Sequence, residues 1–204
     1  MSQERGRSRA ALGFAVKSGW AAAVLVSGSA KVPRMADSRR IELSDPAVPA
    51  ARQPYHDGFA TARSGPKLVR LLTSVETFGR RSVSSLIREL QTAGHDVSGA
   101  GIVVGSLIDP ASIGNEHIRI HALEGRLFRG VVEGAATASG LACTIWRERD
   151  LHTAATRILK RPEQSLRATL TTLGRDAHGG WRVEQKTAAL AGWLVLQSAF
   201  AQES

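Results

Sequence analysis

The chain has 204 residues, of which 43% are hydrophobic and 22% charged, proportions that exclude wholesale disorder and fibrous repeats. Its single cysteine, Cys143, excludes an intrachain disulfide framework and a multi-cysteine zinc site. The net charge is +9, and the first 100 residues carry most of it, with 15 basic and 8 acidic side chains. This excess of positive charge permits a polyanionic ligand. The preference for Arg over Lys, 22 to 5, is equally typical of a GC-rich genome.

The N-terminal segment is basic and then apolar. Three arginines precede an apolar stretch over residues 10–30, which superficially resembles an export signal: Arg5, Arg7 and Arg9. Lys17 lies in the middle of that stretch, so we interpret it instead as two strands, over 12–16 and 21–26. The turn between them is Lys17-Ser18-Gly19. We therefore expect a cytoplasmic protein with no membrane-spanning segment.

The organisation that follows is a single domain. We expect a basic flexible tail over residues 1–10 and one domain over 11–200, with a third strand at 39–43. Residues 44–65 hold three prolines and two glycines and are predicted to form a loop. Helical periodicity begins at Pro66 and continues to Gly94, with Gly79 as a point where it divides into two helices.

Strands and helices alternate in the rest of the chain. The predicted strands are an apolar run flanked by glycines and a second short run, over 101–108 and 141–146. The predicted helices cover 115–139, 152–159, 162–173 and 183–200. An opening β-meander followed by β-α-β crossovers indicates an α/β fold, with a mixed sheet and helices on both faces.

This order of elements resembles the ribonuclease H-like fold, and specifically its RuvC-type Holliday-junction resolvase branch. The local similarities are the Lys17-Ser18-Gly19 turn after the first strand, the strand around Ile102–Val104, and Ala188-Ala189-Leu190-Ala191 in the last helix. The resemblance covers roughly residues 11–197. It implies a ribonuclease H-like mixed sheet and a connection with polynucleotides.

The activity of that family needs carboxylates at the strand ends and in the final helix, where they bind two divalent ions. The position of its first acid is held here by Lys17, and that of its second acid falls near Gly105, with Asp109 four residues on. In the last helix the corresponding positions fall near Glu184 and Thr187. The resemblance therefore implies the fold, with a degenerate acidic site and no cofactor.

Three hypotheses about function remain open. The first is a catalytically degenerate domain that binds a partner, with structured nucleic acid as the first candidate; besides the N-terminal arginines, its expected contacts are Lys17, Arg80, Arg81, Arg126 and Arg129. The second is a nuclease dependent on Mg or Mn, with a rearranged set of carboxylates: Asp109, Glu133, Asp150 and Glu184. The third is a protein-interaction subunit that docks through the apolar last helix with Trp193, or self-associates.

Histidines provide a further candidate site. His117, His121 and Glu124 lie at i, i+4 and i+7 of one predicted helix, a spacing at which two histidines can chelate zinc with a third ligand one turn later or elsewhere. An ordinary polar helix face has the same pattern. The Tyr55-His56-Asp57 segment similarly offers an acid–base pair or simply a turn.

Overall fold

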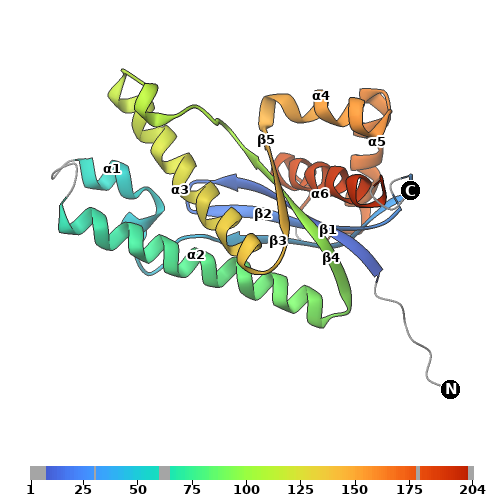
Figure 1. Ribbon diagram of the computed structural model, residues 1–204, viewed down its shortest axis with the longest axis horizontal. Helices are drawn as coiled ribbons and strands as arrows, with labels where there is room; N and C mark the ends of the chain where they lie inside the picture. Colours follow the sequence, from blue (N-terminus) through green and yellow to red (C-terminus); the bar gives the residue numbers. More distant parts are fainter. Residues whose placement is uncertain (1–7, 30, 60–64, 178–179, 202–204) are drawn as a thin grey trace.

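The computed structural model describes residues 8–29, 31–59, 65–177 and 180–201. Its centre is a five-stranded sheet with the order β3-β2-β1-β4-β5 (Figure 1). The strands are β1 (Ser8–Lys17), β2 (Trp20–Gly28), β3 (Pro33–Glu42), β4 (His95–Val104) and β5 (Ala142–Arg147). The first three strands are antiparallel, whereas β4 runs parallel to β1 and β5 parallel to β4. The predicted mixed sheet is therefore confirmed.

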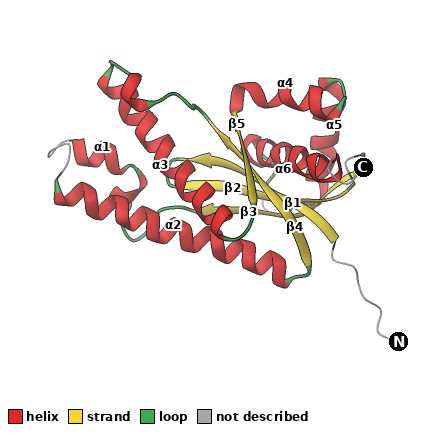
Figure 2. Cartoon of the chain, viewed as in Figure 1, coloured by secondary structure: helices red, strands yellow, loops and turns green. Residues whose placement is uncertain are grey.

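Helices cover both faces of this sheet (Figure 2). One face packs against α2 (Pro66–Thr92) and α3 (Glu116–Ala138). The other packs against α4 (Glu148–Leu159), α5 (Glu163–Leu173) and α6 (Val183–Ala201). A short helix, α1 (Pro54–Phe59), contacts both α2 and α3.

Alternate residues of β1 serve the two faces differently. Leu12 and Phe14 are fully buried against the α2 and α3 layer, where large side chains fill the core. The alternate residues Ala11, Gly13 and Ala15 are small, and a Cβ atom on Gly13 would collide with the carbonyl oxygen of Ala188 in α6. Gly192, four residues after Ala188 in α6, lies close to the carbonyl oxygen of Ala11, two residues before Gly13 in β1. The helix α6 therefore runs antiparallel to β1 and begins near the carboxyl end of that strand.

Several boundaries differ from the sequence-based expectations. The sheet includes residues 8–10, which were expected in the tail, because Ala10 pairs with Ser27 and Val97 on its two neighbouring strands. Residues 1–7 lie outside the described residues. β4 ends at Val104 and not at residue 108, and the expected loop over 44–65 contains α1.

Gly79 does not divide α2, which is one helix of 27 residues. The glycine is instead a point of close packing. A Cβ atom there would lie 2.8 Å from the carbonyl oxygen of Leu43 and 2.6 Å from a methyl group of Val131 on α3. The absent side chain lets α2 approach its neighbours, and helical geometry tolerates glycine at a modest cost.

Trp193 lies on α6 with none of its surface exposed, in the core on the face of the sheet that α4, α5 and α6 cover. The hypothesis that this tryptophan docks on a partner protein is therefore wrong, because its apolar surface is already used within the domain. Within the part of the chain that the structure describes, no helix is both long enough and apolar enough to cross a membrane.

Candidate nucleic-acid interface

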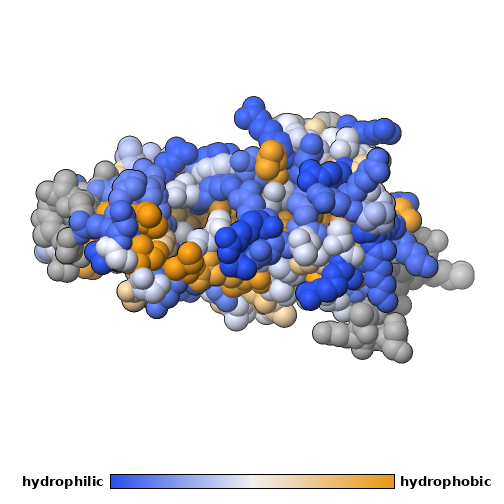
Figure 3. Space-filling view, turned by 90° about the horizontal axis from the view of Figure 1, so that it is seen from above, coloured by the Kyte–Doolittle hydropathy of each residue, from blue (hydrophilic) through white to orange (hydrophobic). Residues whose placement is uncertain are grey.

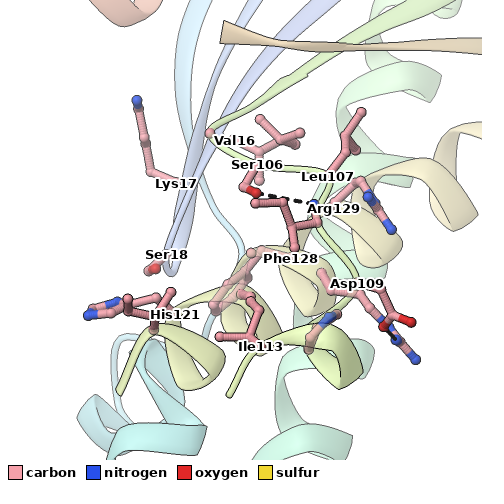
Figure 4. A pocket seen from close by; sticks show the side chains of 18 residues that line it. Val16, Lys17, Ser18, Ser106, Leu107, Asp109, Ile113, His121, Phe128 and Arg129 are labelled. Atoms are coloured by element: carbon pink, nitrogen blue, oxygen red, sulfur yellow. Dashed lines mark hydrogen bonds and ion pairs between the residues drawn. The ribbon is translucent and has the colours of Figure 1, made fainter. Parts of the chain in front are cut away.

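A pocket of about 610 Å³ opens at the carboxyl edge of the sheet (Figure 4). β1 ends there at Lys17, and β4 leads into the loop from Gly105 to Asp109. The N-terminal half of α3 closes the pocket on its other side. Because β1 and β4 are parallel, both strands end at the same edge, which is where α/β sheets commonly bind their ligands.

Three cationic side chains line the pocket: Lys17, Arg126 and Arg129. Arg126 is exposed and lies 3.6 Å from the carboxylate of Asp109, which also lines the pocket. The Nε atom of Arg129 is buried and has no hydrogen-bond partner among the described residues. A buried donor that lacks an acceptor is costly. The residue as a whole is only half-buried, and a guanidinium that lines a pocket is a suitable partner for an anionic oxygen.

Lys17 is paired with an acid that the sequence analysis missed. Its Nζ atom donates to Glu148 at 3.1 Å, and both side chains are more than a third exposed, at 35% and 40%. Glu148 opens α4 immediately after β5, which is parallel to β4 and so ends at the same edge. The signal in the sequence that could have identified Glu148 is its position just after a predicted strand. In Figure 4 the Lys17 side chain points away from His121.

The four carboxylates proposed for a rearranged nuclease site do not meet in the pocket. Of the four, Asp109 alone lines it, and its carboxylate also caps the following turn by accepting from the backbone N–H of Ala111 at 3.1 Å. Asp150 pairs with Arg147. Two others lie on separate elements outside the pocket lining, in α3 and in the first turn of α6: Glu133 and Glu184.

The remaining predicted cations are dispersed. Arg80 and Arg81 lie on α2 outside the pocket lining, where the Arg81 guanidinium stacks on Phe78 at 5.4 Å from the ring centre. Arg9 is half-buried near the start of β1, at the edge of the sheet opposite Lys17. Arg5 and Arg7 lie outside the described residues. Lys17, Arg126 and Arg129 are therefore the predicted contacts that the fold brings together.

The mouth of the pocket also carries apolar surface. Leu107, Ile108 and Ile118 line the pocket and are 42%, 59% and 56% exposed. Figure 3 shows such hydrophobic surface, interrupted by hydrophilic side chains, toward the end of the molecule that carries α1. Cations beside apolar side chains form a surface suited to a phosphate that carries an organic group.

A cluster of three histidines adjoins this pocket, because His121 belongs to both. The predicted pair is present, with the Nε2 atoms of His117 and His121 3.1 Å apart. Glu124 is not their third partner: its side chain is 1% exposed and its Oε1 atom lies 3.2 Å from Nδ1 of His56. Burial raises the pKa of Glu124, and hydrogen bonds from His56 and Tyr55 oppose that rise. His56 thus joins the pair in place of the expected carboxylate.

The strand order, the crossovers, the two helical layers and the polar edge together define an α/β protein of the ribonuclease H-like fold, as the sequence resemblance implied. The structure of RuvC from Thermus thermophilus is similar, with a TM-score of 0.55, 10% identity, and coverage of 95% of this chain and 96% of that one. A second structure, of T. thermophilus RuvC in complex with a Holliday junction substrate, has a TM-score of 0.53 and 11% identity and covers 96% and 95%. No protein-family model and no curated protein sequence matches the chain. The chain therefore has a RuvC-type fold, with very low sequence identity to these structures.

Proposed function

We propose that this protein binds branched or otherwise structured nucleic acid through the pocket at the carboxyl edge, and that it does so without cutting it. The observation that carries the proposal is the convergence of three cations, Lys17, Arg126 and Arg129, on one pocket at the sheet edge, where the Nε atom of Arg129 also lacks an acceptor among the described residues. Phosphate oxygens are acceptors of the required charge and geometry. The similar fold of a RuvC structure with a Holliday junction substrate supports a branched ligand.

Lys17 supports the part of the proposal that excludes cleavage. Where the resembling family needs a metal-binding acid at the end of the first strand, this chain presents an ammonium group, and Glu148 neutralises it at 3.1 Å. Asp109 is engaged by Arg126 and by its own turn. This set does not fit a pair of divalent ions, because a cation holds one ligand position and the remaining acids are paired or dispersed.

The test is an anisotropy titration of a four-way junction, with duplex and single-stranded DNA of the same sequence for comparison. Wild-type protein should prefer the junction at low salt, with affinity falling steeply as salt rises. The double variant R126Q/R129Q should weaken junction binding by about tenfold or more and reduce the salt slope by about one for each phosphate that is no longer neutralised. Absence of affinity for all three substrates at low salt would refute the proposal.

Two matched variants make this experiment specific. Arg157→Gln removes one positive charge from α4 outside the pocket lining and should change affinity less than twofold. R80Q/R81Q removes two charges from α2 and should have a smaller effect than R126Q/R129Q. If all variants weaken binding equally, the pocket is not the binding surface and only net charge matters.

Cleavage is tested separately, by incubating the junction with Mg²⁺ or Mn²⁺. We expect intact junction at all times. Cleavage that Asp109→Asn abolishes would overturn the non-catalytic part of the proposal and favour a rearranged nuclease site. It would leave the binding part intact, because affinity is measured without the metal.

A further inference from the structure

We propose that His56, His117 and His121 form a zinc site that links α1 to α3 beside the pocket. His117 and His121 lie one turn apart on α3, and His56 reaches them from α1. The proposal concerns a metal held by three imidazoles and stands independently of nucleic-acid binding and of the carboxylate chemistry of the resembling family.

The three rings already converge. One nitrogen from each histidine lies within 4.8 Å of the other two, and the Nε2 atoms of His117 and His121 are 3.1 Å apart. The ring centre of His121 lies 4.6 Å from that of His56 and 4.6 Å from that of His117, so His121 is the middle member. Ligand nitrogens about 2.0–2.1 Å from a tetrahedral zinc lie roughly 3.4 Å from one another, so small side-chain rotations complete the site.

Glu124 prepares His56 for this purpose. Its Oε1 atom accepts from the backbone N–H groups of Tyr55 and His56, at 3.1 and 3.3 Å, and lies 3.2 Å from Nδ1 of His56. When the carboxylate is ionised, Nδ1 must carry the hydrogen, which leaves the lone pair of Nε2 free for a metal. A carboxylate behind a histidine in this way fixes the ring and raises its basicity at zinc sites.

The burial of Glu124 agrees with such an arrangement. Its side chain is 1% exposed, and the second oxygen, Oε2, has no hydrogen-bond partner among the described residues. A buried carboxylate is costly unless a positive charge lies nearby. A dication held by His56 would supply that charge through one imidazole ring.

The ligand set selects the class of ion. Three imidazole nitrogens suit Zn²⁺ and similar transition ions, whereas Mg²⁺ and Ca²⁺ require oxygen ligands. His117 and His121 are exposed, so the fourth position faces solvent and can hold a water molecule. The ion would fasten the short α1 helix to α3 at the margin of the pocket.

The experiment uses the full chain without a histidine tag, freed of metal with a chelator and then titrated with Zn²⁺ against a chromophoric competitor. We expect one equivalent bound with submicromolar affinity, and tetrahedral visible bands when Co²⁺ replaces Zn²⁺. Zinc should also raise the Tm, because it binds the folded chain. Mg²⁺ at the same concentration should do neither.

Variants test each part of the site. His117→Asn and His121→Asn alter exposed side chains and should lower zinc affinity at least about 100-fold, because each removes a ligand. Glu124→Gln should lower it about 10- to 100-fold without changing the stoichiometry. His152→Gln, on α4 at the other face of the sheet, is the matched control and should bind as wild type.

Two outcomes would overturn the proposal. One is wild-type protein that binds less than one equivalent of zinc at micromolar concentration. The other is zinc binding that His117→Asn and His121→Asn leave unchanged, since the ion would then sit elsewhere. Circular dichroism and the Tm of each metal-free variant establish that any loss of binding does not come from unfolding.

Discussion

The Lys17–Glu148 pair and the His56–Glu124 pair each join a helix glutamate to a base from another element. Lys17 lines the pocket, whereas His56 lies beside it, in contact with His121 of the pocket lining. The contrast lies in the two acids: Glu148 is 40% exposed beside a Lys17 that is 35% exposed, whereas Glu124 is 1% exposed although its partner His56 is 26% exposed. We refer to the second pair as the buried pair because its acid is buried. In the exposed pair, two full charges cancel each other in water. In the buried pair, the acid holds a ring and two backbone N–H groups in place.

This difference shows which parts of the carboxyl edge remain available for a ligand. Lys17 already has a partner, so the charge that stands out in the sequence contributes less to an anion site than its position suggests. Arg129 lines the pocket, and its Nε atom has no acceptor among the described residues. His117 and His121 are exposed and lie beside His56, which Glu124 holds in place. The side chains that remain available for a phosphate or a metal ion therefore lie mainly on α3: Arg129, His117 and His121.

The largest expected effect is on stability, from Glu124→Ala. This change leaves two backbone N–H groups and Nδ1 of His56 without their acceptor, in a place where the removed side chain was buried. We expect the free energy of unfolding to fall by about 2–4 kcal/mol in urea titrations of the metal-free protein. Glu148→Ala should lower it by less than about 1 kcal/mol. Equal costs for the two changes would remove the distinction between the pairs.

A smaller effect is expected on affinity, from Glu148→Gln. The change removes a negative charge beside the pocket and releases the ammonium of Lys17. Junction affinity at low salt should rise about threefold, and the gain should disappear as salt screens the exposed charges. Glu124→Gln, assayed without metal, should leave affinity unchanged, because its carboxylate faces His56 and the backbone and not the pocket. A decrease with Glu148→Gln would mean that the ion pair shapes the site.

The coupling within the exposed pair should be smaller still. A double-mutant cycle of Lys17→Met and Glu148→Gln, followed by urea unfolding, should give a coupling energy of about 0.5 kcal/mol or less. Salt at about 0.5 M should reduce it further. A coupling above about 2 kcal/mol would show that the pair is shielded from water in solution, and then the comparison with Glu124 would fail.

The course of the chain was predictable because local signals mark it. Ser18-Gly19 forms the turn between β1 and β2 with glycine at φ +81°, and the helical spacing that starts at Pro66 becomes α2. The pairs that define the site were not predictable. Lys17 and Glu148 are 131 residues apart and His56 and Glu124 are 68 apart, and neither periodicity nor spacing reports which distant residues meet.

The histidine cluster on α1 and α3 and the single His152 on α4 differ in their exposure to solvent, as the two acid–base pairs do. His117 and His121 share a cluster with His56, whereas Nδ1 of His152 on α4 is buried without a hydrogen-bond partner among the described residues. The sequence did not predict the helix α1, because the proline and glycine within it and on either side of it are typical of a loop. Two backbone N–H groups of α1 donate to Glu124 of α3, a residue that the sequence spacing predicted as a metal ligand.

The smallest expected effect is the pH dependence that His152 contributes. Desolvation by burial, aided by the charge of Arg167, lowers the pKa of His152 below its usual 6.5. The unfolded chain therefore binds the proton more readily than the folded one. Stability from this group is complete above pH 6.5 and is lost as the pH falls through the depressed folded pKa. We expect the Tm of metal-free His152→Gln to fall less than that of wild type between about pH 7.5 and about pH 5. An identical fall in both proteins would show that His152 is solvated like an exposed histidine.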